Sequence, residues 1–472
     1  MNEKNVTWND LLVFGGFLFE PLEENRFDLS CEKAFNLSFL VKLLCHLRVD
    51  HVFNAKKLQL NTPVPTRQSW IECLKTYAGK GDEGTAVEKL QLENLDAPII
   101  GVVRQLIRLG IRTTQSCGGH ERGGQRKSLP YLKLACPTDL LIVKTLFNKL
   151  GFWSRITRHQ AIKIFEASDR LYDLGLALSK VEDILPFRYE INQVREKTLE
   201  ELLSIPGETY HEEKVREYVL DLLPEFMDKV WADEAGNVLG IKNCGIGPVI
   251  LISAHMDIRE PLSIGSKLLK LDGIWERDIG ILGADDRAGM AIIFNILKDL
   301  NENLFQGTLK VAFTVEEEQG QIGAKFIEKN FFEGVDYAIS LDRRNGSDVV
   351  NKSRFLNYGS EDYSNLFERA SMNLWNDQHR YSSTEGGVSD LRVWSQMGIE
   401  SVNLSIGFYN EHTDKEYLNL EEWHRVHDLV LMSFDLLYRE YQSMEYRKRI
   451  RNIDEKTRNS SVGIQASKMV DR

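Results

Sequence analysis

The sequence lacks the features that mark secreted or membrane-spanning proteins. Its 472 residues include only six cysteines, which are scattered without the spacing of a disulfide framework. In a chain of this length, that scatter favours free thiols in a reducing compartment. The apolar stretch near the start, residues 11–19, contains two glycines and lies between Asp10 and Glu20. It is too short for a membrane span and no positively charged segment precedes it, so we expect a cytoplasmic protein with no membrane partner.

The sequence also lacks a surplus of basic residues. The 70 acidic residues outnumber the 59 basic ones, which gives a net charge of −11. Because general nucleic-acid binding requires a basic face, we expect no nucleic-acid partner. No internal repeat is present. What the sequence does have is a globular composition, with 42% apolar and 27% charged residues, and this excludes a mostly disordered chain.

Length and segment character predict three parts. A chain of this size is long enough for two or three domains with an ample core. We expect an N-terminal α+β module at residues 1–190, a second domain at residues 191–443, and a charged, disordered tail at residues 444–472. Residues 181–197 are expected to form the connection, with the first helix of the second domain beginning at Thr198.

Three apolar runs in the second domain end in residues that can bind a metal. Residues 249–254 are followed by His255, residues 309–315 by the three glutamates 316–318, and residues 337–341 by Asp342. Continuous apolar runs are typical of parallel strands buried on both faces, and open α/β sheets place their chemistry at the carboxyl ends of such strands. We therefore expect one imidazole and several carboxylates to meet at one edge of a sheet.

Two further segments complete this pattern. Asp285 lies in a turn that leads into a helix, and His412 follows a strand near residues 401–406. A single histidine after a strand is more often structural than a ligand. Five such residues in order favour a metal site: His255, Asp285, Glu318, Asp342 and His412. Histidine nitrogen and carboxylate oxygen together suit a borderline divalent ion such as zinc.

The motifs in this order resemble those of the co-catalytic zinc exopeptidase superfamily, which includes peptidase T, the tetrahedral aminopeptidases and the bacterial leucyl aminopeptidases. They are His-x-Asp at 255–257, Gly-Ala-Asp-Asp-Arg-Ala-Gly at 283–289, Glu-Glu-x-Gly at 317–320, Asp342 and His412. The resemblance covers about residues 198–441. It implies an α/β fold of the phosphorylase/hydrolase-like type, with a mixed, mostly parallel sheet sandwiched by helices.

The resemblance also implies a cofactor and its ligands. It implies two divalent metal ions per chain, with zinc as the first choice and cobalt or manganese as alternatives. His255 and either Glu318 or Asp342 would be terminal ligands, Asp285 would bridge the two ions, and His412 would complete the second site. A cis peptide bond between Asp285 and Asp286 is implied as well.

A further carboxylate is needed to take a proton from water and pass it to the leaving amine. Strict strand alternation would place Glu316 and Glu318 on one face and Glu317 on the other. The register of the superfamily makes Glu317 the base and Glu318 the ligand, and it leaves Glu316 without a role. Asp257 is expected to hold the ring of His255 through its second nitrogen, with an ordinary turn residue as the alternative.

The substrate contacts are less sharply marked. Ser389 and Asp390 lie in the loop that corresponds to a substrate-facing loop of the superfamily, but they could equally cap the helix at residues 391–397. Arg343 and Arg344 directly follow Asp342, so they could bind a carboxylate or neutralise the acidic edge. The chain has no room for the inserted domain of many relatives, because only 30 positions separate His255 from Asp285 and only 70 separate Asp342 from His412.

The N-terminal module resembles no family that we recognise. Helical spacing at residues 34–47, 99–109 and 140–152, with strands at 111–117 and 131–136, predicts a small α+β module. Within it, Cys117 and His120 could be zinc ligands with Cys136 as a third. A closed site lacks a fourth candidate, and Arg122, Arg126 and Lys127 could instead form an anion-binding loop. A plain glycine-rich turn is the alternative that we favour.

The sequence as a whole favours a metal-dependent, aminopeptidase-like exopeptidase that acts on short peptides. A second interpretation keeps the site and changes the substrate to an N-acyl amino acid, which would make the protein a deacylase. A third is a regulatory protein with an idle metal site, although no ligand and no base is missing. Motifs do not separate the first two, because specificity resides in the walls of the pocket. The oligomeric state stays open.

Overall fold

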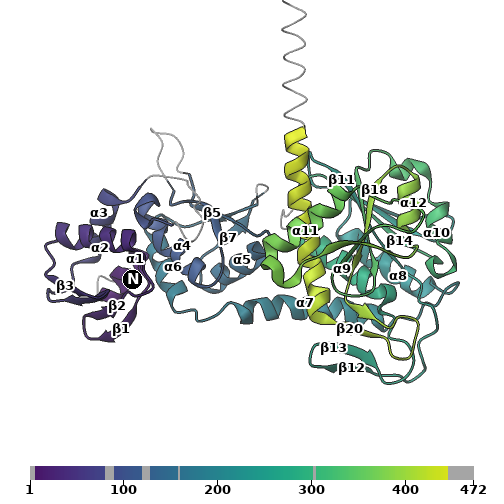
Figure 1. The fold of residues 1–472 in the computed structure, drawn as a ribbon, viewed down its shortest axis with the longest axis horizontal. Helices are drawn as coiled ribbons and strands as arrows, with labels where there is room; N and C mark the ends of the chain where they lie inside the picture. Colours follow the sequence, from purple (N-terminus) through teal and green to yellow (C-terminus); the bar gives the residue numbers. More distant parts are fainter. Residues whose placement is uncertain (1–5, 80–89, 120–127, 158–159, 301–304, 445–472) are drawn as a thin grey trace, which may run out of the picture. The chain divides into compact units, whose positions relative to one another are not determined.

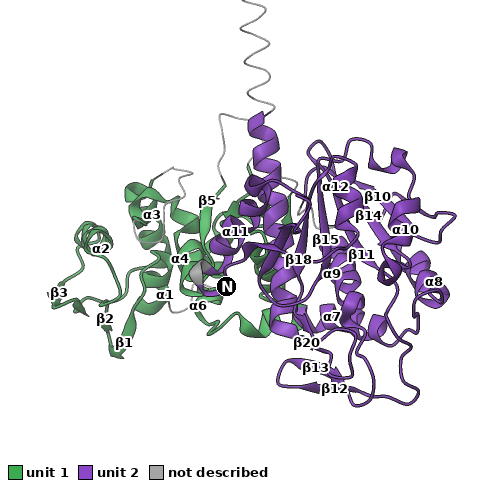
Figure 2. Cartoon of the chain, turned by 45° about the vertical axis from the view of Figure 1, so that its right-hand side comes forward, with its two compact units in different colours: residues 1–191 green, residues 192–472 purple. Residues whose placement is uncertain are grey.

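The computed structural model describes residues 6–79, 90–119, 128–157, 160–300 and 305–444 (Figure 1). The chain forms two compact units, residues 1–191 and residues 192–472, coloured separately in Figure 2. His120, Arg122, Arg126 and Lys127 lie outside the described residues, as does the predicted tail beyond Met444.

The first unit contains two antiparallel sheets of four strands each. Their orders are β1-β2-β4-β3 and β5-β6-β8-β7. The strands are β1 Glu20–Glu23, β2 Arg26–Asp28, β3 His51–Asn54, β4 Lys57–Leu60, β5 Thr113–Cys117, β6 Tyr131–Leu134, β7 Ser154–Ile156 and β8 Ala161–Ile164. Only β5 and β6 were predicted, so the module contains more sheet than the sequence pattern indicated.

Six α-helices lie wholly within the described part of this unit. They are α1 Trp8–Phe14, α2 Ala34–His46, α3 Arg67–Tyr77, α4 Ile100–Arg108, α5 Asp139–Lys149 and α6 Arg170–Ser179. The helix predicted at residues 99–109 corresponds to α4, and Gly110 follows it with a φ of +84°, a left-handed conformation that glycine adopts without a steric penalty. A buried ion pair joins α4 to the segment just before α2: Arg104 Nη2 lies 3.0 Å from Glu32 Oε1.

The second unit is built on one eight-stranded sheet with the order β17-β16-β18-β15-β11-β14-β10-β9. The strands are β9 Lys229–Ala232, β10 Val238–Asn243, β11 Val249–His255, β14 Thr308–Thr314, β15 Tyr337–Arg343, β16 Asp348–Lys352, β17 Ser382–Glu385 and β18 Glu400–Ser405. The central strands β14, β11, β15 and β18 run parallel, while β9, β10 and β16 add antiparallel pairs. The predicted α/β class with a mixed, mostly parallel sheet is confirmed.

A second, four-stranded sheet of this unit has the order β12-β13-β20-β19. Its strands are β12 Leu268–Leu271, β13 Ile274–Arg277, β19 Phe408–Tyr409 and β20 Tyr417–Asn419. The hairpin β12–β13 lies in the interval between His255 and Asp285. The interval between Asp342 and His412 holds strands β16 to β19 and two helices, at Glu361–Trp375 and Leu391–Gln396.

Helices cover both faces of the large sheet. They are α8 Glu213–Leu222, α9 Ala284–Leu300, α10 Ile322–Phe326, α11 Glu361–Trp375, α12 Leu391–Gln396 and a closing helix whose described part is residues 420–444. Helix α7, Leu185–Leu203, covers most of the predicted connection at residues 181–197 and corrects the prediction that a helix begins at Thr198. No proline or glycine interrupts the chain between Pro186 and Pro206, so one continuous helix spans the junction.

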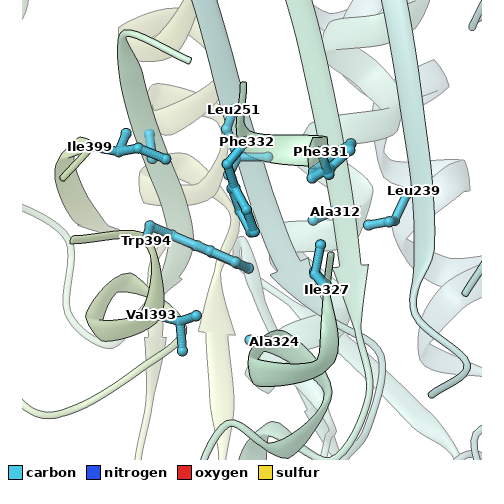
Figure 3. Close-up of a cluster of buried hydrophobic side chains, with 11 residues drawn as sticks. Leu239, Leu251, Ala312, Ala324, Ile327, Phe331, Phe332, Val393, Trp394 and Ile399 are labelled. Atoms are coloured by element: carbon cyan, nitrogen blue, oxygen red, sulfur yellow. The ribbon is translucent and has the colours of Figure 1, made fainter. Parts of the chain in front are cut away.

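The two faces of the sheet bury different partners. On one face, α9 packs beneath β11 and β15, with the ring of Phe294 stacked 5.3 Å from that of Phe313. On the other face, Leu251 and its neighbours pack against Phe332 and Trp394 (Figure 3). The alternation along β11 is the reason, because successive residues of a strand point to opposite faces. A sheet buried on both sides leaves only its ends free for polar chemistry.

Among the described helices, none combines the length and the apolar character needed to cross a membrane.

Candidate metal centre

Three neighbouring parallel strands end at the same edge of the large sheet. Strand β11 ends at His255, β15 carries Asp342 next to its last residue, and β14 leads into a short 3-10 turn, η5 Glu317–Gln319. In the sheet order β15-β11-β14, these strands are direct neighbours. Residues far apart in the sequence therefore meet because the carboxyl ends of parallel strands lie side by side.

Asp285 joins them from the beginning of α9. His255 Nε2 lies 3.0 Å from Asp285 Oδ1 and 3.5 Å from Asp342 Oδ1. The peptide bond between Asp285 and Asp286 is cis, as the resemblance implied. These side chains are nearly buried, since that of His255 is 2% exposed and that of Asp285 is 10% exposed.

His412 approaches from the turn between β19 and β20. Its Nε2 atom lies 2.5 Å from Glu318 Oε1 and 3.1 Å from Asp285 Oδ2. All five predicted ligand residues are thus brought together. His255 and His412 contact the same carboxylate of Asp285 from its two oxygens, which is the arrangement expected of a bridging carboxylate.

The geometry of this cluster fits a cation better than a set of hydrogen bonds. The buried atoms His412 Nε2 and Glu318 Oε1 are close to each other, yet neither makes a hydrogen bond of acceptable geometry with any described residue. Ligand atoms of His255, Asp285 and Glu318 lie within 4.8 Å of one another, and so do those of His255, Asp286 and Asp342. Nitrogen and carboxylate donors in this combination suit zinc.

Electrostatics within the cluster support the same conclusion. Burial raises the pKa of Asp342 to about 7, with His255 acting in the opposite direction. Burial opposes a charge on His255, but hydrogen bonds with Asp257, Asp285 and Asp342 raise its pKa well above 6.5. Buried carboxylates this close repel one another, and a divalent cation between them offsets that repulsion.

Asp257 organises the cluster from behind. His255 Nδ1 lies 2.9 Å from the backbone oxygen of Asp257 and 3.3 Å from its Oδ1 atom. The Asp257 carboxylate also accepts hydrogen bonds from the backbone N–H groups of Glu317 and Glu318, at 3.0 and 3.2 Å. The Asp257 carboxylate therefore orients both the His255 imidazole and the η5 turn. The sequence predicted only its contact with His255.

The three consecutive glutamates do not lie on a strand. Strand β14 ends at Thr314, and Glu316 adopts a left-handed conformation with a φ of +52° before the η5 turn. Strand alternation therefore does not decide their register. Glu318 faces His412, while Glu317 is 8% exposed and accepts a hydrogen bond from Gln321 Nε2 at 3.2 Å. Burial and the charge of Asp342 raise the pKa of Glu317 to about 9.

The sequence analysis assigned no role to two buried carboxylates. Glu416 accepts hydrogen bonds from the backbone N–H groups of Gly283, Ala284 and Asp285, at 2.9, 2.8 and 3.2 Å. Asp286 accepts from the N–H of His255 at 3.1 Å. Both act on backbone groups, which leave no mark in a sequence. The one available signal for Glu416 was its position one short turn after His412.

A cavity of about 220 Å³ opens onto the cluster. Four of the five proposed ligands line it, all except His255. The other lining residues include Glu317, Arg343, Arg344, Ser389, Asn403, Phe408 and Glu411. Ser389 Oγ accepts a hydrogen bond from Asn403 Nδ2 at 3.2 Å. Asp390 stands at the N-cap position of α12 but makes no capping bond, and its Oδ2 atom accepts from Thr314 Oγ1 at 2.5 Å. Asp390 thus braces β14 and does not line the cavity.

Two histidines of the closing helix and two cysteines of the first unit lie outside this cluster. His424 Nε2 lies 2.9 Å from Glu196 Oε1, and His427 Nε2 lies 3.0 Å from Asp299 Oδ2, so both bind carboxylates within the helical layer, as structural residues do. In the first unit, the N–H of Gly119 donates to Cys117 Sγ at 3.4 Å. Neither Cys117 nor Cys136 belongs to a possible metal-binding group among the described residues.

Comparison with known proteins supports the resemblance. Residues 238–433 match the sequence model of Peptidase family M28. The cytosol non-specific dipeptidase of Escherichia coli is 31% identical over 167 residues, which are 31% of this chain and 33% of that protein. Peptidase T of Lysinibacillus sphaericus is 41% identical over 81 residues, 17% of this chain and 18% of that protein.

The chain also has some similarity to solved structures. The aminopeptidase PepT from Bacillus cereus is 18% identical, with a TM-score of 0.47 over 52% of this chain and 98% of that one. The chain spans about a third of the length of the dipeptidase and less than a fifth of the length of this peptidase T. The predicted resemblance, expected over about residues 198–441, is confirmed for residues 238–433, which match the model of Peptidase family M28.

Proposed function

We propose, from the match of residues 238–433 to Peptidase family M28, that this protein is a metal-dependent exopeptidase that removes N-terminal residues from short peptides. The observation that carries the proposal is the convergence of two histidines and two carboxylates, Glu318 and Asp342, around Asp285, with the buried carboxylate of Glu317 beside them. In this proposal His255, Asp285, Glu318, Asp342 and His412 hold two divalent cations, zinc being the first choice.

Two cations bound there would supply Lewis acidity and make a water molecule more acidic. Glu317 would take a proton from the attacking water, whose oxygen bonds to the scissile carbonyl carbon. The same carboxyl would then give that proton to the nitrogen of the leaving amine as the C–N bond breaks. Glu317 is buried and lines the same cavity as the proposed ligands, which is the position that such a proton carrier requires.

Asp257 and Glu416 would be positioning residues in this scheme. Asp257 fixes the imidazole of His255 and the backbone of Glu317. Glu416 fixes the backbone that carries Asp285. Partners of this kind keep ligands in place and make them better donors.

Glu411 favours a free amino terminus over an acylated one. It lines the cavity, and its buried Oε2 atom has no hydrogen-bond partner among the described residues. A carboxylate oxygen of this kind suits a substrate ammonium group, because charge-assisted hydrogen bonds are stronger than neutral ones. An N-acyl group would offer no positive charge to this carboxylate.

The test is a panel of dipeptides to tetrapeptides with free or acetylated amino termini, assayed with added zinc, cobalt or manganese. Hydrolysis of the free peptides alone, abolished by a chelator, supports an aminopeptidase. Hydrolysis of the acetylated peptides alone would make the protein a deacylase. No hydrolysis of either set with any of the three metals would reject the proposed enzyme.

A further inference from the structure

Two neighbouring residues of β15, Asp342 and Arg343, line the same cavity. In a regular strand one of them would face away, because successive side chains point to opposite faces. The pairing of β15 with β18 is irregular here: Ser340 pairs with Asn403, but Arg343 pairs with Ser405. The extra residue on β15 is a bulge, a feature that redirects side chains. The bulge explains how a carboxylate and the adjacent guanidinium reach one cavity.

The guanidinium of Arg343 is held in place by one edge. Its Nε atom donates to Asp348 Oδ2 at 3.3 Å, and Asn345 Nδ2 donates to the same oxygen at 3.1 Å. The Arg343 side chain is 19% exposed, so it is largely desolvated. A side chain fixed in this way loses little freedom when it binds a ligand.

The other edge of the guanidinium is unoccupied by protein. Among the described residues, Asp348 is the sole carboxylate within ion-pair distance of Arg343, and the two terminal nitrogens have no hydrogen-bond partner. Arg343 therefore does not neutralise the carboxylates of the metal centre. Arg344 differs, because its Nη1 atom lies 2.8 Å from Glu411 Oε1 and its side chain is 52% exposed.

The planar guanidinium of an arginine, a fork of N–H groups, recognises carboxylates especially well. The two terminal nitrogens of an arginine match the two oxygens of a carboxylate and form parallel hydrogen bonds. The cavity is small, about 220 Å³, and apolar side chains such as Val350, Val388 and Phe408 also line it. Its ligand must therefore be compact, with an anionic group close to the bond that is cut.

We propose that Arg343 captures a carboxylate of the substrate and gives the enzyme a preference for small peptides with such a group next to the scissile bond. The inference rests on the proposed peptidase function. The carboxylate has two possible sources: the α-carboxylate of a dipeptide, or the acidic side chain of an N-terminal residue. Both present the same planar anion to the fork.

Three substrates of the full-length, zinc-loaded protein separate these sources. Ala-Ala carries an α-carboxylate, Asp-Ala amide carries only a side-chain carboxylate, and Ala-Ala amide carries neither. We expect kcat/KM for at least one of the first two to exceed that for Ala-Ala amide by about tenfold or more, as a charge-assisted pair in a partly desolvated site provides. Whichever of the two is preferred identifies the source.

Substitutions at Arg343 should remove this preference. In Arg343→Met the ratio is expected to fall to about one, mainly through a higher KM for the carboxylate substrate. Arg343→Lys should restore part of it, since an ammonium keeps the charge without the fork. Arg354→Met is the matched control, because Arg354 is exposed over the Phe355 ring and should keep the wild-type ratio.

A binding measurement keeps the inference separate from the proposed function. Calorimetric titration of the chelator-treated protein with the same three peptides should show tighter binding of the preferred carboxylate peptide, and this difference should vanish in Arg343→Met. If no peptide is hydrolysed, the proposed function fails, whereas the binding difference still supports Arg343. Equal binding of all three peptides by the wild type, or a preference that survives in Arg343→Met, would overturn the inference.

Discussion

The two units bury charge in opposite ways. In the first, Glu32 is fully buried and its partners satisfy it: Arg104 Nη2 at 3.0 Å, the N–H of Leu18 at 2.8 Å and Asn36 Nδ2 at 3.1 Å. In the second, several buried carboxylates crowd two histidines, and buried atoms such as Glu318 Oε1 lack hydrogen bonds among the described residues. The first arrangement is closed and serves stability. The second is incomplete, and we infer that cations complete it.

Sheet topology underlies this difference. The first unit has two antiparallel sheets of four short strands, whose neighbouring strand ends alternate in direction. The second has parallel central strands, so the last residues of β11, β14 and β15 lie at the same edge of the sheet. Buried charge is therefore paired around Glu32 in the first unit and accumulates at this sheet edge in the second. Four measurements break or sharpen this comparison.

The largest effect is expected from Glu317→Gln. This change keeps the shape of the side chain and removes only its ability to carry the proton, so kcat should fall by about 10²–10⁴-fold. Bound metal, measured by mass spectrometry of the native protein, should not change. Glu316→Gln is the control one residue away, and it should retain wild-type kcat. Comparable losses in both variants would refute the proposed register.

Arg104→Met tests the closed pair of the first unit. It leaves Glu32 buried without its cation, which typically costs about 3–5 kcal/mol of unfolding free energy. Arg26→Met, which breaks the exposed pair with Glu23, should cost at most about 1 kcal/mol. Urea unfolding read by hydrogen exchange in α2 and α4 measures both. Similar costs for the two variants would mean that burial of this pair does not matter.

Removal of metal should affect one unit only. A cation at 100 times its dissociation constant stabilises the state that binds it by about 2.7 kcal/mol. After treatment with a chelator, amide exchange should accelerate in β11 and β15, while α4 of the first unit should be unaffected. Equal acceleration in both units would contradict a metal centre confined to the second.

The smallest effect is an acid sensitivity at Asp299. Burial alone would raise the pKa of this carboxyl, but His427 and Arg195 hold it below 3.8. The native state thus binds the proton less readily than the unfolded chain. Its contribution to stability is present above about pH 3.8 and is lost as the pH falls through the lower, native pKa. Asp299→Asn should flatten the acid limb of a stability–pH curve, and an unchanged limb would exclude this role.

The sequence predicted the central strands and the five proposed ligands because both leave a local trace. The strands β11, β14 and β15 are mostly apolar, and a histidine or an acid stands at or just after the end of each. Strand β1, in contrast, is Glu-Pro-Leu-Glu and exposed along its whole length, so it has no alternation to detect. Helix α7 was misplaced because its N-terminal half has few buried residues.

Features that act through the backbone were beyond the sequence analysis. Glu416 and Asp286 bind N–H groups, whose positions depend on the folded chain. The turn at Glu316 breaks the strand period that would have set the glutamate register. The bulge in β15, which turns Arg343 toward the cavity, arises from its pairing with β18. Each of these depends on contacts between segments far apart in the sequence.

Helix α9 has 15 buried residues out of 17, and Trp423 of the closing helix donates its indole N–H to the Ala288 carbonyl at 3.0 Å. The ribosome releases α9 well before residues 420–444 exist to cover it. Until then, the growing chain exposes the residues of α9 that are buried in the folded protein. We therefore expect a chain that stops before residue 420 to expose apolar residues of α9 and to aggregate more readily than the longer chain.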